Sequence, residues 1–292
     1  MDVSVILVNY NTKDMTRDCL NSIFNFTKDL DFEVFVVDNN SQDGSSEMIE
    51  QDFPQVRLIK NSENKGFGSA NNIAIRQSEA KYVFCLNTDT FLVDNSIKKL
   101  FDFMENPENK NVGSCGCQLL DKNMQPQHSY GCYPRISRII FTLFGLALLF
   151  PKTYRRIFTQ TKNENDETPY EVEYITGADL FIRKSVLDEV GMYDEDFFMY
   201  FEDSELEYRI KKAGYKNVII PTVHIVHYCG LPPKNPPLPR LKMSRESEIK
   251  YYSKRSGKFA ALFVKILYLF RYIFDVRFNK SYIEKILLHY NL

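Results

Sequence analysis

The sequence predicts an α/β fold in which a mostly parallel central sheet is flanked by helices and followed by a helical C-terminal extension. Short apolar runs alternate with helical patterns over residues 1–90, which is typical of parallel strands joined by crossover helices. Polar residues directly follow three of these runs, at the edge where sheets of this kind bind ligands. We therefore expect a ligand site at the carboxyl edge of the sheet.

The expected elements follow in order from the N-terminus. A β-branched run over residues 3–8 is the first strand, and apolar residues at helical spacing begin at Met15. After residue 107 the alternation loosens, and it resumes between residues 172 and 226. The predicted strands are 3–8, 32–37, 56–59 and 82–86, with helices over 15–24, 43–51 and 65–75.

The C-terminal part of the chain differs in composition from the rest. Five prolines between residues 231 and 239 argue against a helix or a central strand there. Residues 240–292 carry 12 Lys and Arg against 4 Asp and Glu, whereas the whole chain has a net charge of −1. We therefore expect a domain over 1–230, a Pro-rich linker over 231–239 and a basic amphipathic helical tail over 240–292.

Composition excludes several classes of protein. A chain of 292 residues with 14% aromatic residues is no disordered protein, and its balanced charge argues against a nucleic-acid partner. Met1 runs almost directly into the first strand, so we expect no signal peptide. Six cysteines without C-x-x-C spacing are expected to be reduced thiols in the cytoplasm. A zinc site from Cys115, Cys117 and Cys132 is the alternative for three of them.

Two acidic residues follow predicted strands. Asp38 ends the second strand, where a carboxylate can accept a hydrogen bond from a base or a ribose hydroxyl. Asp89 follows the fourth strand, and Mg²⁺ or Mn²⁺ typically takes one or two such carboxylates together with substrate phosphates. An N-cap or a turn is the alternative interpretation of both positions.

A second acidic pair, Glu202 and Asp203, follows an aromatic stretch and opens a helical pattern. Acidic residues in a first helical turn complement the helix dipole, which is a purely structural role. A carboxylate among bulky apolar groups instead has a raised pKa and can act as a general base. Farther on, His224 and His227 would face opposite sides of a regular strand, so only one could reach a given metal ion.

Taken together, these stretches resemble the inverting family 2 glycosyltransferases, which have the Rossmann-like GT-A fold, and in particular their rhamnosyltransferase-like branch. The resemblance covers roughly residues 1–230 in the family's order. The matching stretches are Val5–Asn11, Val36–Ser45, Asn64–Gly68 with Asn71 and Asn72, Leu86–Thr90, Thr176–Ala178, Phe197–Arg209 with Lys212–Tyr215, and the segment around His227.

The resemblance implies catalytic and metal-binding roles. Asp203 would be the catalytic base, with Glu202 as the second candidate. Asp89 and His227 would hold Mg²⁺ or Mn²⁺, with Asn87 in the place of the first Asp of the family's D-x-D element.

The resemblance also implies where the two substrates lie. Gly177 and Ala178 would form the loop beside the donor sugar and the acceptor. The nucleotide would lie against Val8, Tyr10, Asp38, Gly66, Asn71, Asn72, Asn87 and Thr88.

The implied activity is transfer of a sugar from dTDP-rhamnose or a UDP-sugar to a glycan or lipid-linked acceptor in cell-surface polysaccharide synthesis. One carboxylate that removes the acceptor's proton suffices for an inverting displacement, and a divalent cation neutralises the leaving diphosphate. The alternatives are a nucleotidyltransferase-like protein, whose Gly-rich stretch is replaced here by Asn9–Thr12, and a catalytically silent nucleotide-sugar-binding protein.

Two apolar stretches predict a membrane surface as a partner. Residues 139–150 are too few to span a bilayer, and residues 259–274 are interrupted by Lys265 and Arg271. Apolar faces flanked by basic residues are typical of helices that lie at an anionic lipid interface. We therefore expect a cytoplasmic protein held peripherally on the inner face of the plasma membrane. Packing onto the catalytic domain, or a homodimer through the C-terminal helices, is the alternative.

Overall fold

The computed structural model describes residues 1–159, 167–228 and 237–278. The chain divides into two compact units. The sheet unit comprises Met1–Gly131, Lys162–Phe198 and Glu202–Leu231, and the helical unit comprises Cys132–Thr161, Met199–Phe201 and Pro232–Leu292. Cys229, most of the predicted linker and the end of the predicted tail lie outside the described residues.

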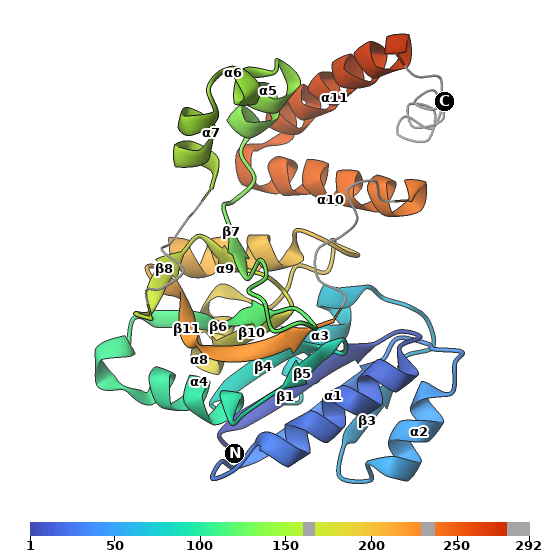
Figure 1. The fold of residues 1–292 in the computed structure, drawn as a ribbon. Coiled ribbons are helices and arrows are strands. Elements are labelled where there is room, and N and C mark those ends of the chain that lie inside the picture. Colours follow the sequence, from blue (N-terminus) through green and yellow to red (C-terminus); the bar gives the residue numbers. More distant parts are fainter. Residues whose placement is uncertain (160–166, 229–236, 279–292) are drawn as a thin grey trace. The chain divides into compact units, whose positions relative to one another are not determined.

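The sheet unit is built on one large mixed sheet with the strand order β3-β2-β1-β4-β10-β6-β11-β5 (Figure 1). An additional strand, β8, pairs with β11, and a separate two-stranded sheet joins β7 to β9. The strands are β1 (Val3–Asn9), β2 (Phe32–Asp38), β3 (Arg57–Lys60), β4 (Tyr82–Asn87), β5 (Thr90–Leu92), β6 (Val112–Leu120), β7 (Tyr130–Gly131), β8 (Tyr170–Val172), β9 (Tyr174–Ile175), β10 (Asp179–Arg183) and β11 (Lys216–His227).

Neighbouring strands of the N-terminal half end level with one another. Strands β3, β2, β1 and β4 are parallel, as the sequence predicts, and their runs are apolar because both faces of the sheet are covered. The register pairs Asn9 of β1 with Asp38 of β2, and Val8 with Asn87 of β4. The polar residues that follow these strands therefore meet at one edge of the sheet.

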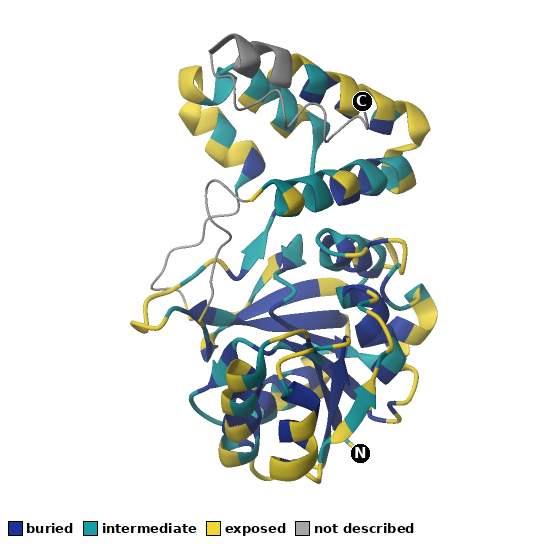
Figure 2. Ribbon diagram, turned by 90° about the vertical axis from the view of Figure 1, so that its right-hand side faces the viewer, coloured by how far each residue is buried: buried dark blue, intermediate teal, exposed yellow. Residues whose placement is uncertain are grey.

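Helices cover both faces of this sheet. One core cluster joins it to α1 (Lys13–Phe26), α2 (Ser45–Asp52) and α4 (Ser96–Glu105). The other joins it to α3 (Phe67–Ile75), α8 (Lys184–Val190) and α9 (Glu202–Lys212). Figure 2 shows the strands between these layers as buried. A short 3₁₀ turn, Pro107–Asn109, follows α4. The predicted α/β class with a mostly parallel central sheet is confirmed.

Several strands depart from the parallel arrangement that the sequence predicts, since β5 and β8 pair antiparallel with β11. β10 lies antiparallel between β4 and β6, and β11 beyond it has register shifts between Lys216 and Asn217 and between Ile220 and His224. These pairings join residues that are between 66 and about 106 positions apart, so no local sequence pattern predicts them. The position of β10 between β4 and β6 matters for the site, because β10 begins directly after Gly177 and Ala178.

The helical unit contains α5 (Ile136–Leu143), α6 (Leu146–Leu149), α7 (Pro151–Phe158), α10 (Leu238–Ser256) and α11 (Lys258–Phe278). α10 and α11 pack together, and Arg245 of α10 donates to Glu248 and to the hydroxyl of Tyr268 on α11. α10 begins inside the predicted linker, with Pro239 in its first turn, where a missing N–H costs nothing. None of the described helices is long and apolar enough to cross a membrane.

Two stretches of the predicted first domain belong to this helical unit by their contacts. They are Cys132–Thr161, which carries α5 to α7, and the three residues Met199–Phe201. The sequence pattern does not separate them from their neighbours, because a domain boundary is recognised in a sequence only where composition changes.

Candidate active site

A buried hydrogen-bonded network occupies the ends of β1 and β2. The side-chain amide of Asn9 donates to Asp38 Oδ1 (2.6 Å) and to Ser41 Oγ (2.9 Å). Its carbonyl oxygen accepts from the hydroxyls of Thr12 and Thr16, each at 2.7 Å. Asn9 is fully buried and Asp38 nearly so, so this network fixes the Asp38 carboxylate at the sheet edge. Asn9 lies in a stretch that matches the family, but its bonding role could not be predicted from the motif.

The network reaches the next strand through a pair of hydroxyls. Thr12 Oγ1 lies 3.0 Å from Thr88 Oγ1, directly before Asp89. Asp89 in turn lies beside the last residue of β11, with 3.3 Å between its Oδ2 and Nε2 of His227. Both side chains are less than a fifth exposed. The two predicted metal ligands, which are 138 positions apart in the chain, are thus neighbours.

This pair is the metal-binding candidate that the structure offers. In the described part of the chain, no group of three or more His, Cys, Asp and Glu side chains is placed to hold a metal ion. The zinc alternative for Cys115, Cys117 and Cys132 is therefore wrong for the described fold. Burial also raises the pKa of the Cys115 and Cys117 thiols well above their ordinary value, which disfavours the thiolate that zinc requires.

Gly66 sits where α3 meets the loop that leads to α9. Its φ is +83°, and a β-carbon there would overlap the carbonyl oxygen of Phe198. The amide of Phe67 donates to the same oxygen (2.9 Å), while the side chain of Asn39 donates to the carbonyl of Gly66 (3.1 Å). Glycine is required here by both backbone conformation and close approach.

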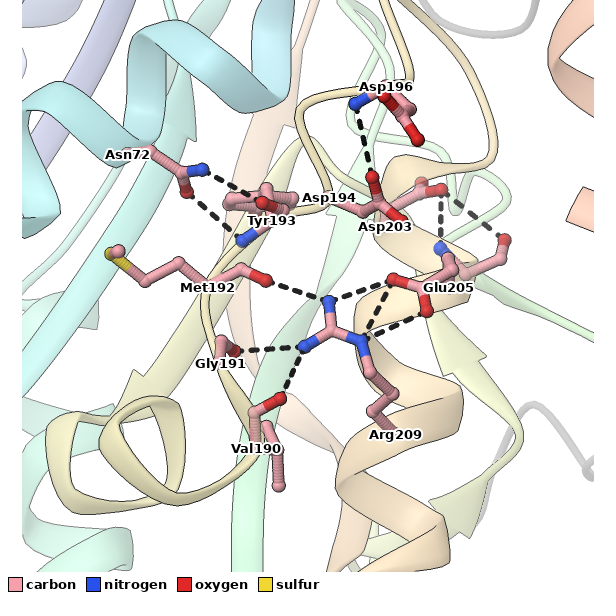
Figure 3. Close-up of polar contacts among 11 residues, drawn as sticks. Asn72, Val190, Gly191, Met192, Tyr193, Asp194, Asp196, Asp203, Glu205 and Arg209 are labelled. Atoms are coloured by element: carbon pink, nitrogen blue, oxygen red, sulfur yellow. Dashed lines mark hydrogen bonds and ion pairs between the residues drawn. The ribbon is translucent and has the colours of Figure 1, made fainter. Parts of the chain in front are cut away.

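The two asparagines of α3 are buried and face protein groups. Asn72 donates to the carbonyl of Tyr193 (2.8 Å) and accepts from its amide (3.0 Å), as Figure 3 shows. It also donates to Glu195 at 3.0 Å. Asn71 donates to the carbonyl of Phe67 (3.0 Å), and its own side-chain oxygen has no hydrogen-bond partner among the described residues. Asn72 thus joins α3 to the loop after α8 through hydrogen bonds.

The Asp203 carboxylate lies in the first turn of α9 and contacts the predicted substrate loop. Its Oδ2 accepts from the amide of Gly177 (3.1 Å), and its Oδ1 accepts from the amide of Ser204 (2.6 Å). The carbonyl of Ala178 accepts from the amide of Asn87 (3.0 Å), which ties the same loop to the end of β4. Burial raises the pKa of Asp203 above its ordinary value, as a general base requires.

Two further buried carboxyls flank Asp203 on α9. Glu202 is 4% exposed, and burial followed by repulsion from Asp203 raises its pKa well above the ordinary value. Its Oε2 has no hydrogen-bond partner among the described residues. Glu207, one turn along the helix, accepts from the amide of Ile175 at 2.9 Å. Asp203 and Glu207 therefore hold the 175–177 backbone together, a role for Glu207 that sequence reasoning missed.

Arg209 connects α9 to the end of α8 (Figure 3). It bonds the Glu205 carboxylate through Nε and Nη2 (2.8–2.9 Å) and donates to the carbonyls of Val190, Gly191 and Met192 at 2.7–3.0 Å. Val190 is the last residue of α8, and Gly191 and Met192 follow it, in the region where backbone carbonyls lack partners inside the helix. Arg209, like Glu207, positions backbone near the site. This role could not be predicted from the sequence, because its partners include backbone carbonyls and no sequence motif specifies these.

The backbone directly before the acidic pair is unusual. Tyr200 and Phe201 both have φ of +68°. Left-handed backbone costs a residue with a β-carbon about 1–2 kcal/mol. The left-handed conformation of Tyr200 and Phe201 must therefore be stabilised by contacts with other parts of the protein.

Contacts therefore connect most of the predicted site. Asp38 is linked to Thr88 through Asn9 and Thr12, Asp89 meets His227, and Asn87 is joined to Asp203 through the loop at 177–178. Tyr10 is half exposed beside this edge and Val8 is partly buried. Asn71 and Asn72 instead bond to other groups of the protein, on α3 and in the loop after α8.

The order of these strands and site residues along the chain matches a known family. The sequence model described as glycosyl transferase family 2 matches residues 4–191, more than half of the chain. The chain belongs to glycosyl transferase family 2. The resemblance stated from the motifs is confirmed, and rhamnosyltransferases are among the relatives of this family 2 chain.

Two relatives and one solved structure define the similarity further. An N-acetylglucosaminyl-diphospho-decaprenol L-rhamnosyltransferase of Mycobacterium tuberculosis is 29% identical over 67% of this chain and 66% of its own length. A dTDP-rhamnosyl transferase, RfbF of Shigella flexneri, is 25% identical over 78% of this chain and 70% of its own. The mannosyltransferase PcManGT from Pyrobaculum calidifontis, solved with GDP-Man and Mn²⁺, superposes with a TM-score of 0.57 at 19% identity, covering 87% of this chain and 63% of that one. This last likeness shows a shared fold.

Proposed function

We propose that the protein is an inverting hexosyltransferase that moves a sugar from a nucleotide-diphosphate sugar to a glycan or lipid-linked acceptor in cell-surface polysaccharide synthesis. The observation that carries the proposal is the Asp203 carboxylate, which is held against Gly177 and has a raised pKa. The names of the rhamnosyltransferase relatives favour dTDP-rhamnose as the donor and a lipid-linked sugar as the acceptor. Since the match spans about two thirds of the mycobacterial relative, the activity of the whole protein belongs to this proposal.

Asp203 acts on the acceptor. Its carboxylate accepts the proton of an acceptor hydroxyl while the hydroxyl oxygen attacks the anomeric carbon of the donor. The bond from that carbon to the diphosphate oxygen breaks, and the nucleoside diphosphate leaves with the electron pair. One displacement inverts the anomeric carbon, and no covalent sugar–enzyme intermediate is needed. Asp203 is preferred to Glu202 for this role, because its carboxylate accepts a hydrogen bond from the amide of Gly177, in the loop that the resemblance places beside the substrates.

The remaining site residues bind the donor. The fixed Asp38 carboxylate would accept hydrogen bonds from the base edge or the ribose, and the half-exposed Tyr10 would stack on the base. Gly66, Asn87 and Thr88 line the same edge through their contacts with Asn39, Ala178 and Thr12.

Asp89 and His227 fit a divalent cation. An oxygen and an imidazole nitrogen lie 3.3 Å apart at the sheet edge, and hard cations combine such ligands with phosphate oxygens and water. Mg²⁺ or Mn²⁺ held there would neutralise charge on the leaving diphosphate. Solved relatives of the fold carry Mn²⁺.

The test is release of nucleoside diphosphate from a panel of dTDP-, UDP- and GDP-sugars, with and without EDTA. Turnover of dTDP-rhamnose that requires Mg²⁺ or Mn²⁺ would support the proposal. Release of pyrophosphate from a nucleoside triphosphate and a sugar phosphate would instead indicate a nucleotidyltransferase. Binding of donors without turnover by any acceptor would indicate a silent binding protein.

We also propose that the helical unit binds the cytoplasmic face of a membrane containing anionic lipid. α11 buries one face, with Ala261, Val264 and Leu267, and yet remains apolar on the other. Large apolar side chains that lie on the surface of this unit are Phe144, Leu148, Leu149, Phe150, Ile157, Phe259, Leu262, Phe263, Ile266 and Phe270. Monomeric proteins seldom expose so many apolar residues on one small unit.

Basic residues accompany this apolar surface. Lys152, Arg155 and Arg156 on α7 are exposed, as are Lys258 and Lys265 on α11. Co-sedimentation with phosphatidylglycerol vesicles should exceed that with phosphatidylcholine vesicles and should fall as salt rises. A concentration-dependent dimer that binds neither vesicle would favour the homodimer, and a monomer that binds neither would contradict the membrane proposal.

A further inference from the structure

Three residues of the helical unit directly precede Glu202 and the proposed base, Asp203. Met199, Tyr200 and Phe201 belong to the helical unit, whereas the residues on both sides belong to the sheet unit. α9 begins at the next residue, Glu202. The backbone of Tyr200 and Phe201 is left-handed, with φ of +68° at both, and such conformations persist only where the surroundings enforce them.

Helix α10 supplies these surroundings with one stripe of side chains. Ser247 Oγ donates to the carbonyl of Met199 at 2.7 Å. The ring of Tyr251 lies 5.9 Å from that of Phe201, and the guanidinium of Arg240 lies 5.7 Å from the ring of Tyr200. Spacings of seven and four residues place Arg240, Ser247 and Tyr251 on one face of the helix. Ser247 and Tyr251 are buried.

The segment is short and fixed at both ends. Before it, the carbonyl of Phe198 accepts from the amide of Phe67 (2.9 Å). After it, the carboxylate of Asp203 accepts from the amide of Gly177 (3.1 Å). Because only four residues separate Phe198 from Asp203, relaxation of the left-handed backbone between them would displace the base from the loop at Gly177.

We propose that the stripe of Arg240, Ser247 and Tyr251 on α10 positions the base, by holding Met199–Phe201 in its left-handed conformation. The inference rests on the proposed role of Asp203. Arg240, Ser247 and Tyr251 are positioning residues in this proposal, because they act on Asp203 through Met199–Phe201. The contacts of α10 with Met199–Phe201 then help to set the conformation of the backbone that leads into Asp203, on whose alignment proton removal depends.

The first test replaces Ser247 with Ala in the full-length chain. Loss of one hydrogen bond to a strained segment should lower kcat for dTDP-rhamnose by about fivefold, with KM and dTDP binding in Mn²⁺ unchanged. The matched control is Ser256→Ala, at an exposed serine of the same helix. Unchanged kcat in Ser247→Ala, or a fall shared by Ser256→Ala, would overturn the proposal.

The second test separates positioning from general loss of structure. Glycine adopts positive φ without strain, so Tyr200→Gly should restore much of the kcat lost in Ser247→Ala. Tyr251→Phe keeps the ring beside Phe201 and should retain kcat, whereas Tyr251→Ala should lose it. A double variant no better than Ser247→Ala alone would overturn the link to backbone strain. Thermal unfolding of each variant shows whether the fold is retained.

The third test distinguishes this proposal from the proposed function. In an Asp203→Asn background, Ser247→Ala should cause no additional loss, because the group that it positions no longer accepts a proton. Full activity of Asp203→Asn would remove Asp203 as the base and the positioning proposal with it. An inactive Asp203→Asn with a fully active Ser247→Ala would overturn only the positioning proposal.

Discussion

The carboxyl edge of the sheet unit and the exposed surface of the helical unit differ in which residue types they bury and expose. At the sheet edge, polar side chains such as Asn9, Asp38 and Asn72 are buried and bonded to other protein groups. On the helical unit, apolar side chains such as Leu148 (87%) and Phe259 (90%) are exposed. Both reverse the usual distribution of polar and apolar residues.

The difference shows how each region can serve a function. Buried polar groups with complete hydrogen bonding are rigid, so a site made from them is aligned before substrate arrives. Exposed apolar side chains contribute nothing to folding stability until a partner covers them. We therefore expect variants at the sheet edge to change chemistry or stability, and variants on the helical surface to change binding alone.

The largest effect is expected at Asp203. Asp203→Asn keeps the shape of the side chain but removes the proton acceptor, so turnover should fall by about 10²–10⁴-fold. Donor binding, measured by calorimetry with dTDP and Mn²⁺, should remain. The control is Asp188→Asn, at an exposed side chain of α8, which should retain turnover. Full turnover in Asp203→Asn would move the base to another group, with Glu202 first in line.

The next effect is expected at Gly66. Gly66→Ala combines positive φ with overlap onto the Phe198 carbonyl, so we expect a loss of stability of about 3 kcal/mol. Gly214→Ala is the matched control, since Gly214 also has positive φ (+95°) but open space around a β-carbon. It should lose only about 1 kcal/mol. Equal urea midpoints for the two variants would show that the close approach at Gly66 does not matter.

A smaller and pH-dependent effect is expected at Glu202. Burial raises its pKa in the folded protein above the ordinary 4.5, so the unfolded chain releases this proton at lower pH. Unfolding then becomes easier as pH rises from about 4.5 to the folded-state pKa, by at most about 1.4 kcal/mol per pH unit. Glu202→Gln should flatten this slope and retain turnover. Parallel urea-unfolding curves for both proteins across pH 5–8 would contradict the assignment.

The smallest effect on stability is expected on the helical surface. Phe259→Ser and Phe263→Ser should change the free energy of unfolding by less than about 0.5 kcal/mol, because both side chains are exposed. Their binding to phosphatidylglycerol vesicles should nevertheless weaken. Val264→Ser, on the buried face of the same helix, is the contrasting variant and should destabilise the unit. Wild-type vesicle binding by both phenylalanine variants would remove α11 from the lipid-binding surface.

The sequence predicts the parts of the fold that depend on local pattern. The strands that contain Val8, Val37 and Leu86 are continuous apolar runs, and the polar residues after them mark the edge where the site lies. Asp89 and His227 were paired only by the family resemblance, and the structure brings them to 3.3 Å.

The rest depends on contacts between distant residues. Three features involve backbone atoms that are distant in the chain. They are the antiparallel pairing of β10, the hydrogen bonds of Asn72 to Tyr193, and the carbonyls that accept from Arg209. The membership of Met199–Phe201 in the helical unit is of the same kind, since neither composition nor periodicity changes there. Local sequence patterns thus predict which residues form the site, and the structure shows the contacts that position these residues.

The anomeric configuration of the product tests the central claim most directly. Proton NMR of the glycoside formed from dTDP-rhamnose, or from whichever donor in the panel is turned over, compares the product's anomeric centre with that of the donor. A single displacement assisted by the Asp203 carboxylate predicts the opposite configuration in the product. A product with the donor's configuration would contradict this account, because retention requires either two displacements or front-side attack.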